Sequence, residues 1–215
     1  MTIEETVTML VEINPENPQL RLIEPIIRQM KSGAIICYPT DTGYGIGCDL
    51  FHPKAIKRLM QLKKRPKKKP FSFMCSDLTH ISQYAHVSNS AYRLLKRNLP
   101  GAYTFVLPGT KLVPRIMASK QKTVGIRVPD HPICNLLIET LANPIINTSV
   151  QLEEDASSGE DNFSEALEIE EYLKNRVDII IDGGRIFPDP SSIIDLTDDY
   201  PVVLREGKGE ITPFL

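Results

Sequence analysis

The sequence of 215 residues contains few cysteines, and their spacing is not that of a metal site. Cys37, Cys48, Cys75 and Cys134 form no C-x-x-C pair and have no matching histidine pair, which argues against zinc. Cys37 lies in an apolar run, where a free thiol behaves as a small hydrophobe. A chain of this length buries roughly 70% of its unfolded surface and needs no disulfides to fold. We therefore expect a protein of a reducing cytosol.

Long hydrophobic runs are also missing. No apolar run approaches the roughly 18 residues that a membrane-spanning helix needs. The segment Met1–Val11 lacks the basic stretch and the apolar core of a signal peptide. These absences predict a cytoplasmic protein with no membrane partner.

Two common nucleotide-binding motifs are absent. The sequence contains no G-x-x-x-x-G-K-[ST], which excludes a P-loop. The glycine-rich run Tyr38–Gly47 is not the dinucleotide fingerprint G-x-G-x-x-G, because Cys48 occupies the place of the last glycine. The residues after it look extended rather than helical, so the run predicts a hairpin-like turn with several hydroxyls. Such a turn is either structural or a place where backbone approaches a phosphate.

The sequence as a whole has no large excess of charge of one sign, but two of its segments do. The 25 basic and 27 acidic residues give a net charge of −2, which excludes a uniformly basic nucleic-acid binder. Nine of the basic residues fall in Lys54–Lys69, which has no acid. Nine of the acids fall in Gln151–Glu171, which has no base. Each block is either an interaction surface or a solvated face, and the acidic block is either a lid or a solvated insertion.

Short strand-like runs alternate with amphipathic helical stretches, without repeats or a linker that divides the chain. This alternation predicts an α/β (α+β) fold with one mixed sheet, in a single domain of residues 1–215. The expected strands are 6–13, 34–38, 70–75, 103–107, 123–128, 145–148, 177–181, 192–196 and 202–205. The expected helices are 19–31, a helix that opens at His52-Pro53, 88–99, 132–141 and 162–174, the last with a capping box at Asn162-x-x-Glu165.

Candidate functional residues are basic or carry hydroxyls. Lys63–Pro70 is a proline-limited basic loop, whose cations could serve a polyphosphate or the backbone of RNA. Arg127 lies in a strand-like run, where a buried guanidinium needs an acidic partner or an anionic ligand. The chain also has Ser149, Ser191 and Ser192 near strand ends and His131 shortly after Arg127.

Taken in order, these segments resemble the YrdC/YciO family, whose best-known activity is threonylcarbamoyl-AMP synthesis for tRNA modification. The matching region runs from about Gly33 to Gly207. The ordered set of markers makes the resemblance specific. The markers are Pro39–Gly45, the K-x-R-x-x-x-K-P pattern over Lys63–Pro70, Pro100-Gly101 with Thr104, Thr123–Pro129 with His131, Thr148-Ser149, Asp182–Gly184, Pro190–Ile193 and Leu204–Gly207.

The resemblance implies a twisted, open sheet with flanking helices around a large basic cavity. It also implies that the amine of L-threonine captures bicarbonate or CO2 and that the resulting N-carboxylate attacks the α-phosphorus of ATP. Pyrophosphate then leaves, and threonylcarbamoyl-adenylate remains. This chemistry depends on positioning and charge neutralisation, so it suits a site of cations and hydroxyls. Mg2+ would enter with ATP, because the chain offers no evident carboxylate cage for a metal of its own.

By the same resemblance, the catalytic residues would be Lys63, Arg65 and Ser149. Lys63 and Arg65 would hold the triphosphate, and Ser149 would contact the carbonate or the α-phosphate. Ser192 and Arg205 would complete the nucleotide site.

The resemblance assigns a second set of residues to threonine. Thr40, Thr42 and Arg127 would bind the amino acid and its carboxylate, with His131 near the amino-acid end.

One departure from the synthases points to the YciO-like branch. The synthases carry an S-A-N run, whereas this chain reads Ser149-Val150-Gln151 and then enters the acidic block. A glutamine presents its amide about one carbon further out than an asparagine.

Three hypotheses follow. The first is an ATP-dependent threonylcarbamoyl-AMP synthase or a weakly active relative. The second is a non-catalytic RNA-binding module, acting at double-stranded RNA, tRNA or ribosomes through Lys54–Lys69. The third is a fold that serves a different small substrate.

Overall fold

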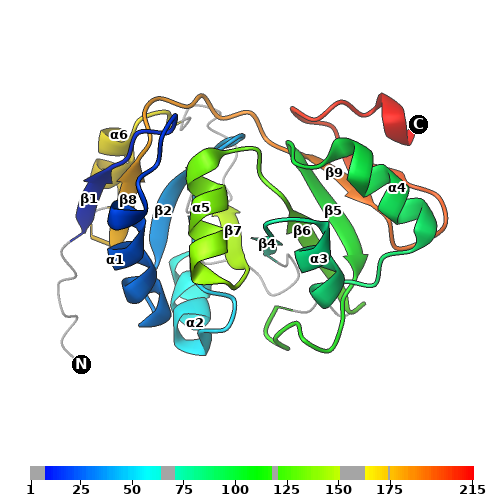
Figure 1. Cartoon of the computed structure of the whole chain (residues 1–215), viewed down its shortest axis with the longest axis horizontal. Coiled ribbons are helices and arrows are strands. Elements are labelled where there is room, and N and C mark those ends of the chain that lie inside the picture. Colours follow the sequence, from blue (N-terminus) through cyan, green and yellow to red (C-terminus); the bar gives the residue numbers. More distant parts are fainter. Residues whose placement is uncertain (1–7, 64–70, 118–120, 151–162, 174) are drawn as a thin grey trace.

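The computed structural model describes residues 8–63, 71–117, 121–150, 163–173 and 175–215. These residues form one mixed ten-stranded sheet with six α-helices packed against it (Figure 1). The strand order is β1-β8-β2-β3-β7-β4-β6-β5-β9-β10. The expected α/β fold with a twisted, open mixed sheet is confirmed.

The bounds of the elements follow the expected pattern closely. The strands are β1 Met9–Glu12, β2 Ile36–Thr40, β3 Gly43–Gly47, β4 Ser72–Met74, β5 Tyr103–Pro108, β6 Thr123–Arg127, β7 Ile145–Ser149, β8 Ile179–Asp182, β9 Ser192–Asp195 and β10 Val202–Arg205. The helices are α1 Leu20–Lys31, α2 Pro53–Leu62, α3 Leu78–Tyr84, α4 Asn89–Asn98, α5 Pro132–Leu141 and α6 Ala166–Leu173, and a 3-10 turn follows at Thr212–Phe214.

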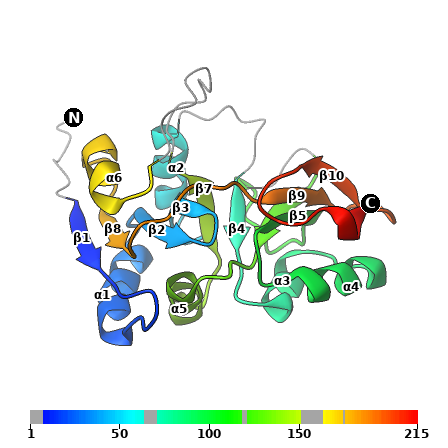
Figure 2. The same ribbon diagram turned by 90° about the horizontal axis from the view of Figure 1, so that it is seen from above.

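Helices cover both faces of the part of the sheet around β2 (Figure 2). Strand β2 alternates between two apolar cores, as a strand buried on both faces must. Ile36 and Tyr38 belong to the core that contains the buried residues of α1 and α5, whereas Cys37 belongs to the core that contains those of α2 and α6. Proline at the first position of α2 and of α5 costs no hydrogen bond, because that N–H has no partner inside a helix.

The other part of the sheet is covered by α3 and α4 on one face only (Figure 2). On β5, Tyr103, Phe105 and Leu107 pack in the same core as the buried residues of these two helices. The alternate residues, Thr104 and Val106, line a cavity instead. The alternation along β5 therefore places the cavity on the face of the sheet opposite α3 and α4.

Two local differences from the expected elements have a clear cause. Helix α3 was not expected, because its seven residues are too few for a helical hydrophobic pattern; Asp77 begins it by accepting from the N–H of His80 at 2.7 Å. Helix α6 begins at Ala166 rather than at 162, and the Glu168 carboxylate accepts from the N–H of Ser164 at 3.1 Å. The capping role expected of Asn162 falls outside the described residues.

None of the described helices is both long and apolar enough to cross a membrane.

Candidate functional site

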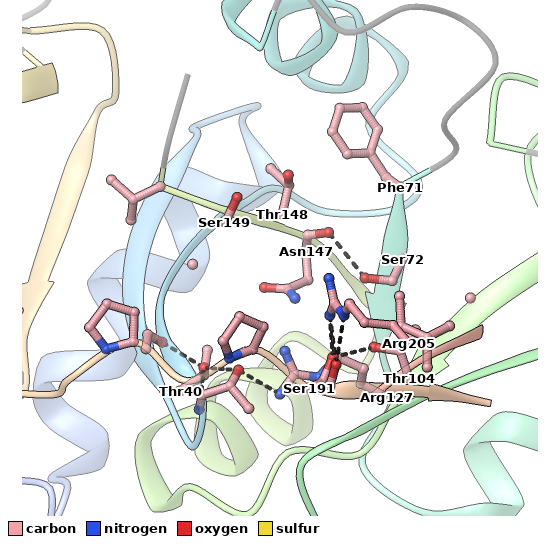
Figure 3. A pocket seen from close by; sticks show the side chains of 18 of the residues that line it. Thr40, Phe71, Ser72, Thr104, Arg127, Asn147, Thr148, Ser149, Ser191 and Arg205 are labelled. Carbon is pink, nitrogen blue, oxygen red and sulfur yellow. Dashed lines mark hydrogen bonds between the residues drawn. The ribbon is translucent and has the colours of Figure 1, made fainter. Parts of the chain in front are cut away.

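A cavity of about 660 Å³ lies at the centre of the sheet (Figure 3). This volume is in the range of small-molecule sites. Its lining comes from the β2–β3 hairpin, from β4, β5, β6, β7 and β9, from Pro188, Pro190 and Ser191, and from the end of β10. Residues that are distant in sequence therefore meet in it.

The hairpin between β2 and β3 forms one wall. Thr40 and Thr42 both line the cavity, and Thr40 Oγ1 donates to the carbonyl of Gly43 at 2.6 Å. Gly43 has φ +117°, a conformation that favours glycine. The turn expected over this run is confirmed as the antiparallel β2–β3 hairpin.

Close packing explains the remaining glycines of β3. A Cβ at Gly45 would lie 2.6 Å from Asn147 Oδ1, and one at Gly47 would lie 1.9 Å from the carbonyl oxygen of Ile146. These glycines let β3 and its neighbour β7 approach each other.

Arg127 is buried at the end of β6 with its guanidinium on the cavity. Its Nη2 donates to Asp41 Oδ1 at 2.8 Å and to Thr42 Oγ1 at 2.9 Å. Its Nε and Asp41 Oδ2 are buried without a hydrogen-bond partner among the described residues. The acidic partner that the sequence required is thus Asp41, which holds the guanidinium from the hairpin side.

Arg205, at the end of β10, supplies a second guanidinium. It donates from Nε and Nη2 to the carbonyl of Ser191 at 3.0 and 2.6 Å. The Ser191 hydroxyl also contacts Thr104 Oγ1 at 2.9 Å. Burial lowers the pKa of Arg205, and the positive charge of Arg127 lowers it further. Two cations that repel each other across one cavity form a site in which an anion is favoured.

Lys63, directly after α2, contacts the site at Ser149 on β7. Its Nζ donates to the carbonyl of Ser149 at 2.8 Å, and Ser149 lines the cavity. The structure therefore brings Thr40, Thr42, Arg127, Ser149 and Arg205 to one cavity, with Lys63 beside it. Arg65 lies outside the described residues.

Two of the expected residues do not line the cavity. Ser192 is fully buried; its hydroxyl donates to the carbonyl of Gly209 at 2.6 Å and accepts from the N–H of Gly207, which ties the C-terminal segment to β9. Its neighbour Ser191, also a candidate from the sequence, lines the cavity. His131 precedes α5, buried, with Nδ1 unpaired among the described residues. Burial lowers the pKa of His131, although the carboxylates of Asp41 and Asp130 oppose this shift.

Sequence reasoning missed several residues of the site. Asp41 stands inside the hairpin motif, and Ser72 and Asn147 lie on the neighbouring strands β4 and β7. Asn147 could have been found from its position two residues before Ser149, because strand alternation places both side chains on one face.

The described lining contains two guanidinium groups, hydroxyls, the Asn147 carboxamide and apolar side chains such as Phe71 and Val106, but no carboxylate and no thiol. Among the described residues, no three histidines, cysteines or acids gather in a possible metal site. The arrangement can bind and orient anionic groups and neutralise their charge, which is the form of catalysis that phosphoryl and nucleotidyl transfer require.

Comparison with known proteins agrees with these features. The Sua5–YciO–YrdC family model, described as "Telomere recombination", matches residues 28–207. YciO of Escherichia coli K12 is 45% identical over 204 residues, which cover 94% of this chain and 97% of that protein. Its crystal structure superimposes with a TM-score of 0.89, covering 97% of this chain and all of that one.

Two archaeal relatives carry more specific names. A putative threonylcarbamoyl-AMP synthase of Methanocaldococcus jannaschii is 30% identical over 208 residues, 96% of this chain and 95% of that protein. The crystal structure of Pyrococcus abyssi Sua5 complexed with L-threonine has a TM-score of 0.84 and 31% identity, and covers 93% of this chain and 58% of that one. The fold, the motifs and these relatives together show that the chain belongs to the Sua5–YciO–YrdC family.

Proposed function

We propose that this protein is a threonylcarbamoyl-AMP synthase or a close functional relative, which condenses L-threonine, bicarbonate and ATP to threonylcarbamoyl-adenylate and pyrophosphate. The observation that carries the proposal is the pair of guanidinium groups, Arg127 and Arg205, on one cavity without a described carboxylate in its lining. The named synthases among the relatives and the Sua5 complex with L-threonine support it.

The side chains divide into two groups in this proposal. Arg127, positioned by Asp41 and flanked by Thr40 and Thr42, receives the threonine carboxylate. A guanidinium suits this role because its planar fork matches a carboxylate.

The second group faces the nucleotide. Arg205 and Ser149 line the cavity where Mg-ATP binds as a substrate, and Lys63 beside them brings a further positive charge. The resemblance to the family implies that Arg65 holds the triphosphate and that Ser192 serves the nucleotide as well. Since Ser192 is bonded to backbone, its contribution is to hold the adjoining loop. Positioning the N-carboxylate in line with the α-phosphorus and neutralising the charge that develops there accelerate the reaction.

Pyrophosphate release tests the proposal. Purified protein should release pyrophosphate from Mg-ATP only when both L-threonine and bicarbonate are present. Arg127→Gln should reduce this rate by at least tenfold, because it removes a charged contact. Arg58→Gln is the matched control, since Arg58 pairs with Asp178 away from the cavity lining. Threonine-independent release, or equal rates in both variants, would contradict the assignment.

Ligand binding gives a second measurement. In the presence of L-threonine, ATP at about 100 times its dissociation constant adds about 2.7 kcal/mol of stability. For a chain of this size that raises the Tm by about 5–11 °C. No shift at millimolar concentrations would favour the alternative of a non-catalytic RNA-binding module.

That alternative stays a prediction. Five of the nine cations of the basic block lie outside the described residues, and Arg58 is bound to Asp178 at 2.7 and 3.0 Å. Lys54 and Lys57 are exposed on α2. If the protein is an RNA-binding module, its affinity for double-stranded RNA in a filter-binding assay should fall steeply as the salt concentration rises.

A further inference from the structure

Asn147 occupies the middle of β7 and lines the cavity, although only 7% of the residue is exposed. Its Oδ1 accepts from the Tyr38 hydroxyl at 2.9 Å. Among the described residues, its Nδ2 has no hydrogen-bond partner. Figure 3 shows the amide projecting from β7 into the cavity. The Nδ2 atom is not among the buried polar atoms of the described residues that lack a partner, so it is open to the cavity and its two N–H donors are available to a ligand.

Tyr38 determines which end of the amide faces the cavity. This tyrosine is fully buried, and burial raises the pKa of its phenol well above the ordinary value, so the group remains an O–H donor. The nearest acceptor for that proton is Asn147 Oδ1, since the alternative, the carbonyl of Ile146, is 3.3 Å away. The Nδ2 group is therefore the end that a ligand meets.

Space for the amide is provided by Gly45 on β3. A Cβ at that position would lie 2.6 Å from Asn147 Oδ1 and would displace the amide. Tyr38 and Gly45 together hold a donor in a fixed place, and such preorganisation is what a binding group needs.

The position along β7 indicates which ligand atom is bound. Asn147 and Ser149 are two residues apart on one strand, so their side chains lie on the same face about 6.6 Å apart. Under the proposed function, Ser149 contacts the carbonate or the α-phosphate. A group that offers only N–H donors there recognises an oxygen acceptor, and a charged oxygen most strongly.

We propose that the Asn147 carboxamide binds an anionic oxygen of the reacting groups, either the carboxylate derived from bicarbonate or the α-phosphate of ATP. The inference rests on the proposed function, and it makes Asn147 a substrate-binding residue with Tyr38 as its positioning residue. It also bears on the departure at Gln151: the cavity has an amide on β7 that does not depend on that position.

The test compares Asn147→Ala, Asn147→Asp and Tyr38→Phe with the wild type. Asn89→Asp is the matched control, because Asn89 is exposed at the start of α4 and the same charge is added away from the cavity. Pyrophosphate release gives KM for bicarbonate and for ATP, and calorimetry gives the affinity for Mg-ATP. Thermal denaturation checks that each variant folds.

Asn147→Ala should raise one of these constants about 10- to 100-fold, as expected for a hydrogen bond to a charged group. Asn147→Asp should be at least tenfold worse than Asn147→Ala, because a carboxylate repels an anion. Tyr38→Phe should raise the same constant about 3- to 10-fold, which a residue with a purely structural role would not do selectively. A change confined to bicarbonate assigns the carboxylate, and a change in Mg-ATP affinity assigns the phosphate.

Several outcomes overturn the proposal. Equal KM values and equal Mg-ATP affinity in the wild type and in folded Asn147→Ala would contradict it. An Asn147→Asp variant that binds the substrates as well as the wild type would also contradict it, since the side chain at position 147 would then act as an acceptor. If Asn147→Asp does not fold, the other two variants decide. If the wild type is active and the variants have the same KM values and Mg-ATP affinity as the wild type, only this inference is contradicted. If the wild type releases no pyrophosphate but binds Mg-ATP, and Asn147→Ala weakens that binding, only the proposed function is contradicted. If the wild type binds neither substrate, the inference and the proposed function both fail.

Discussion

Removing the charge of Asp41 tests whether a buried ion pair holds the cavity's guanidinium in place. The pair joins Asp41 Oδ1 and Arg127 Nη2 at 2.8 Å, and the two side chains are 8% and 6% exposed. Removing one partner of a buried pair leaves an uncompensated charge and costs about 3–5 kcal/mol. Asp41→Asn keeps a neutral acceptor, so we expect the lower end, about 3 kcal/mol. For a chain of this size the Tm then falls by about 6–12 °C.

The assay is urea unfolding followed by far-UV circular dichroism, because the sequence has no tryptophan. Arg58→Met is the comparison, since the Arg58–Asp178 pair is as short at 2.7 Å but Arg58 is 39% exposed. This pair is partly exposed, and Asp178 keeps the N–H of Ile35 as a donor at 2.6 Å, so we expect a loss near that of exposed pairs, about 0.2–1 kcal/mol. The double variant Asp41→Asn/Arg127→Met should lose at least about 1 kcal/mol less than the sum of the two single variants, because the charges disappear together.

Two results would refute this reasoning. One is an Asp41→Asn loss no larger than that of Arg58→Met, which would mean that water or backbone solvates Arg127 as well as Asp41 does. The other is strict additivity in the double variant, which would mean that the two side chains do not stabilise each other.

Three further predictions concern stability and reactivity. Gly47→Ala should destabilise the protein by about 1–3 kcal/mol in urea unfolding, because its Cβ meets the Ile146 carbonyl oxygen at 1.9 Å; Gly184→Ala, with open space but φ +88°, should cost only about 1–2 kcal/mol. Burial lowers the pKa of His131 below its ordinary 6.5, so its neutral form is favoured in the folded state and stability should fall as the pH drops below about 6.5. His131→Gln should make that decline shallower in melts between pH 7.5 and 5; an unchanged slope would contradict it. All four cysteines are free and buried, and burial raises the pKa of Cys48 to about 12. A thiol reagent at pH 8 should therefore react slowly with the native protein and rapidly with all four thiols of the protein unfolded in guanidinium. Fast labelling of the native protein would contradict this prediction.

Local patterns were sufficient to predict most elements of the fold. The helix α5 has the predicted bounds, Pro132–Leu141, because proline at its first position and its apolar spacing both act within the helix. The hairpin in the run Tyr38–Gly47 was likewise predicted from glycine and hydroxyl residues that act over a few positions. Helix α3 was missed because its seven residues carry too little pattern.

The candidate site was predicted less completely. The sequence required an anionic partner for Arg127 but could not choose among 27 acids, and the partner is Asp41, 86 positions away. It named both Ser191 and Ser192 as candidates and assigned the nucleotide to Ser192, whereas Ser191, directly before β9, lines the cavity; only the packing shows which of two neighbouring side chains is buried. Asn147 had no motif of its own, and the placement of its amide depends on the hydroxyl of Tyr38 and on the space left by Gly45.

The sequence alone determined the alternation of strands and helices, the family and the types of residue in the candidate site, since these follow from short-range propensity and from ordered motifs. The tertiary structure decided which of those residues share a cavity and which way each side chain points. The physical reason is that a cavity between strands is made by register and by contacts between segments far apart in the chain, such as the Asp41–Arg127 pair and the packing of β3 against β7. Both depend on where whole strands lie in the sheet.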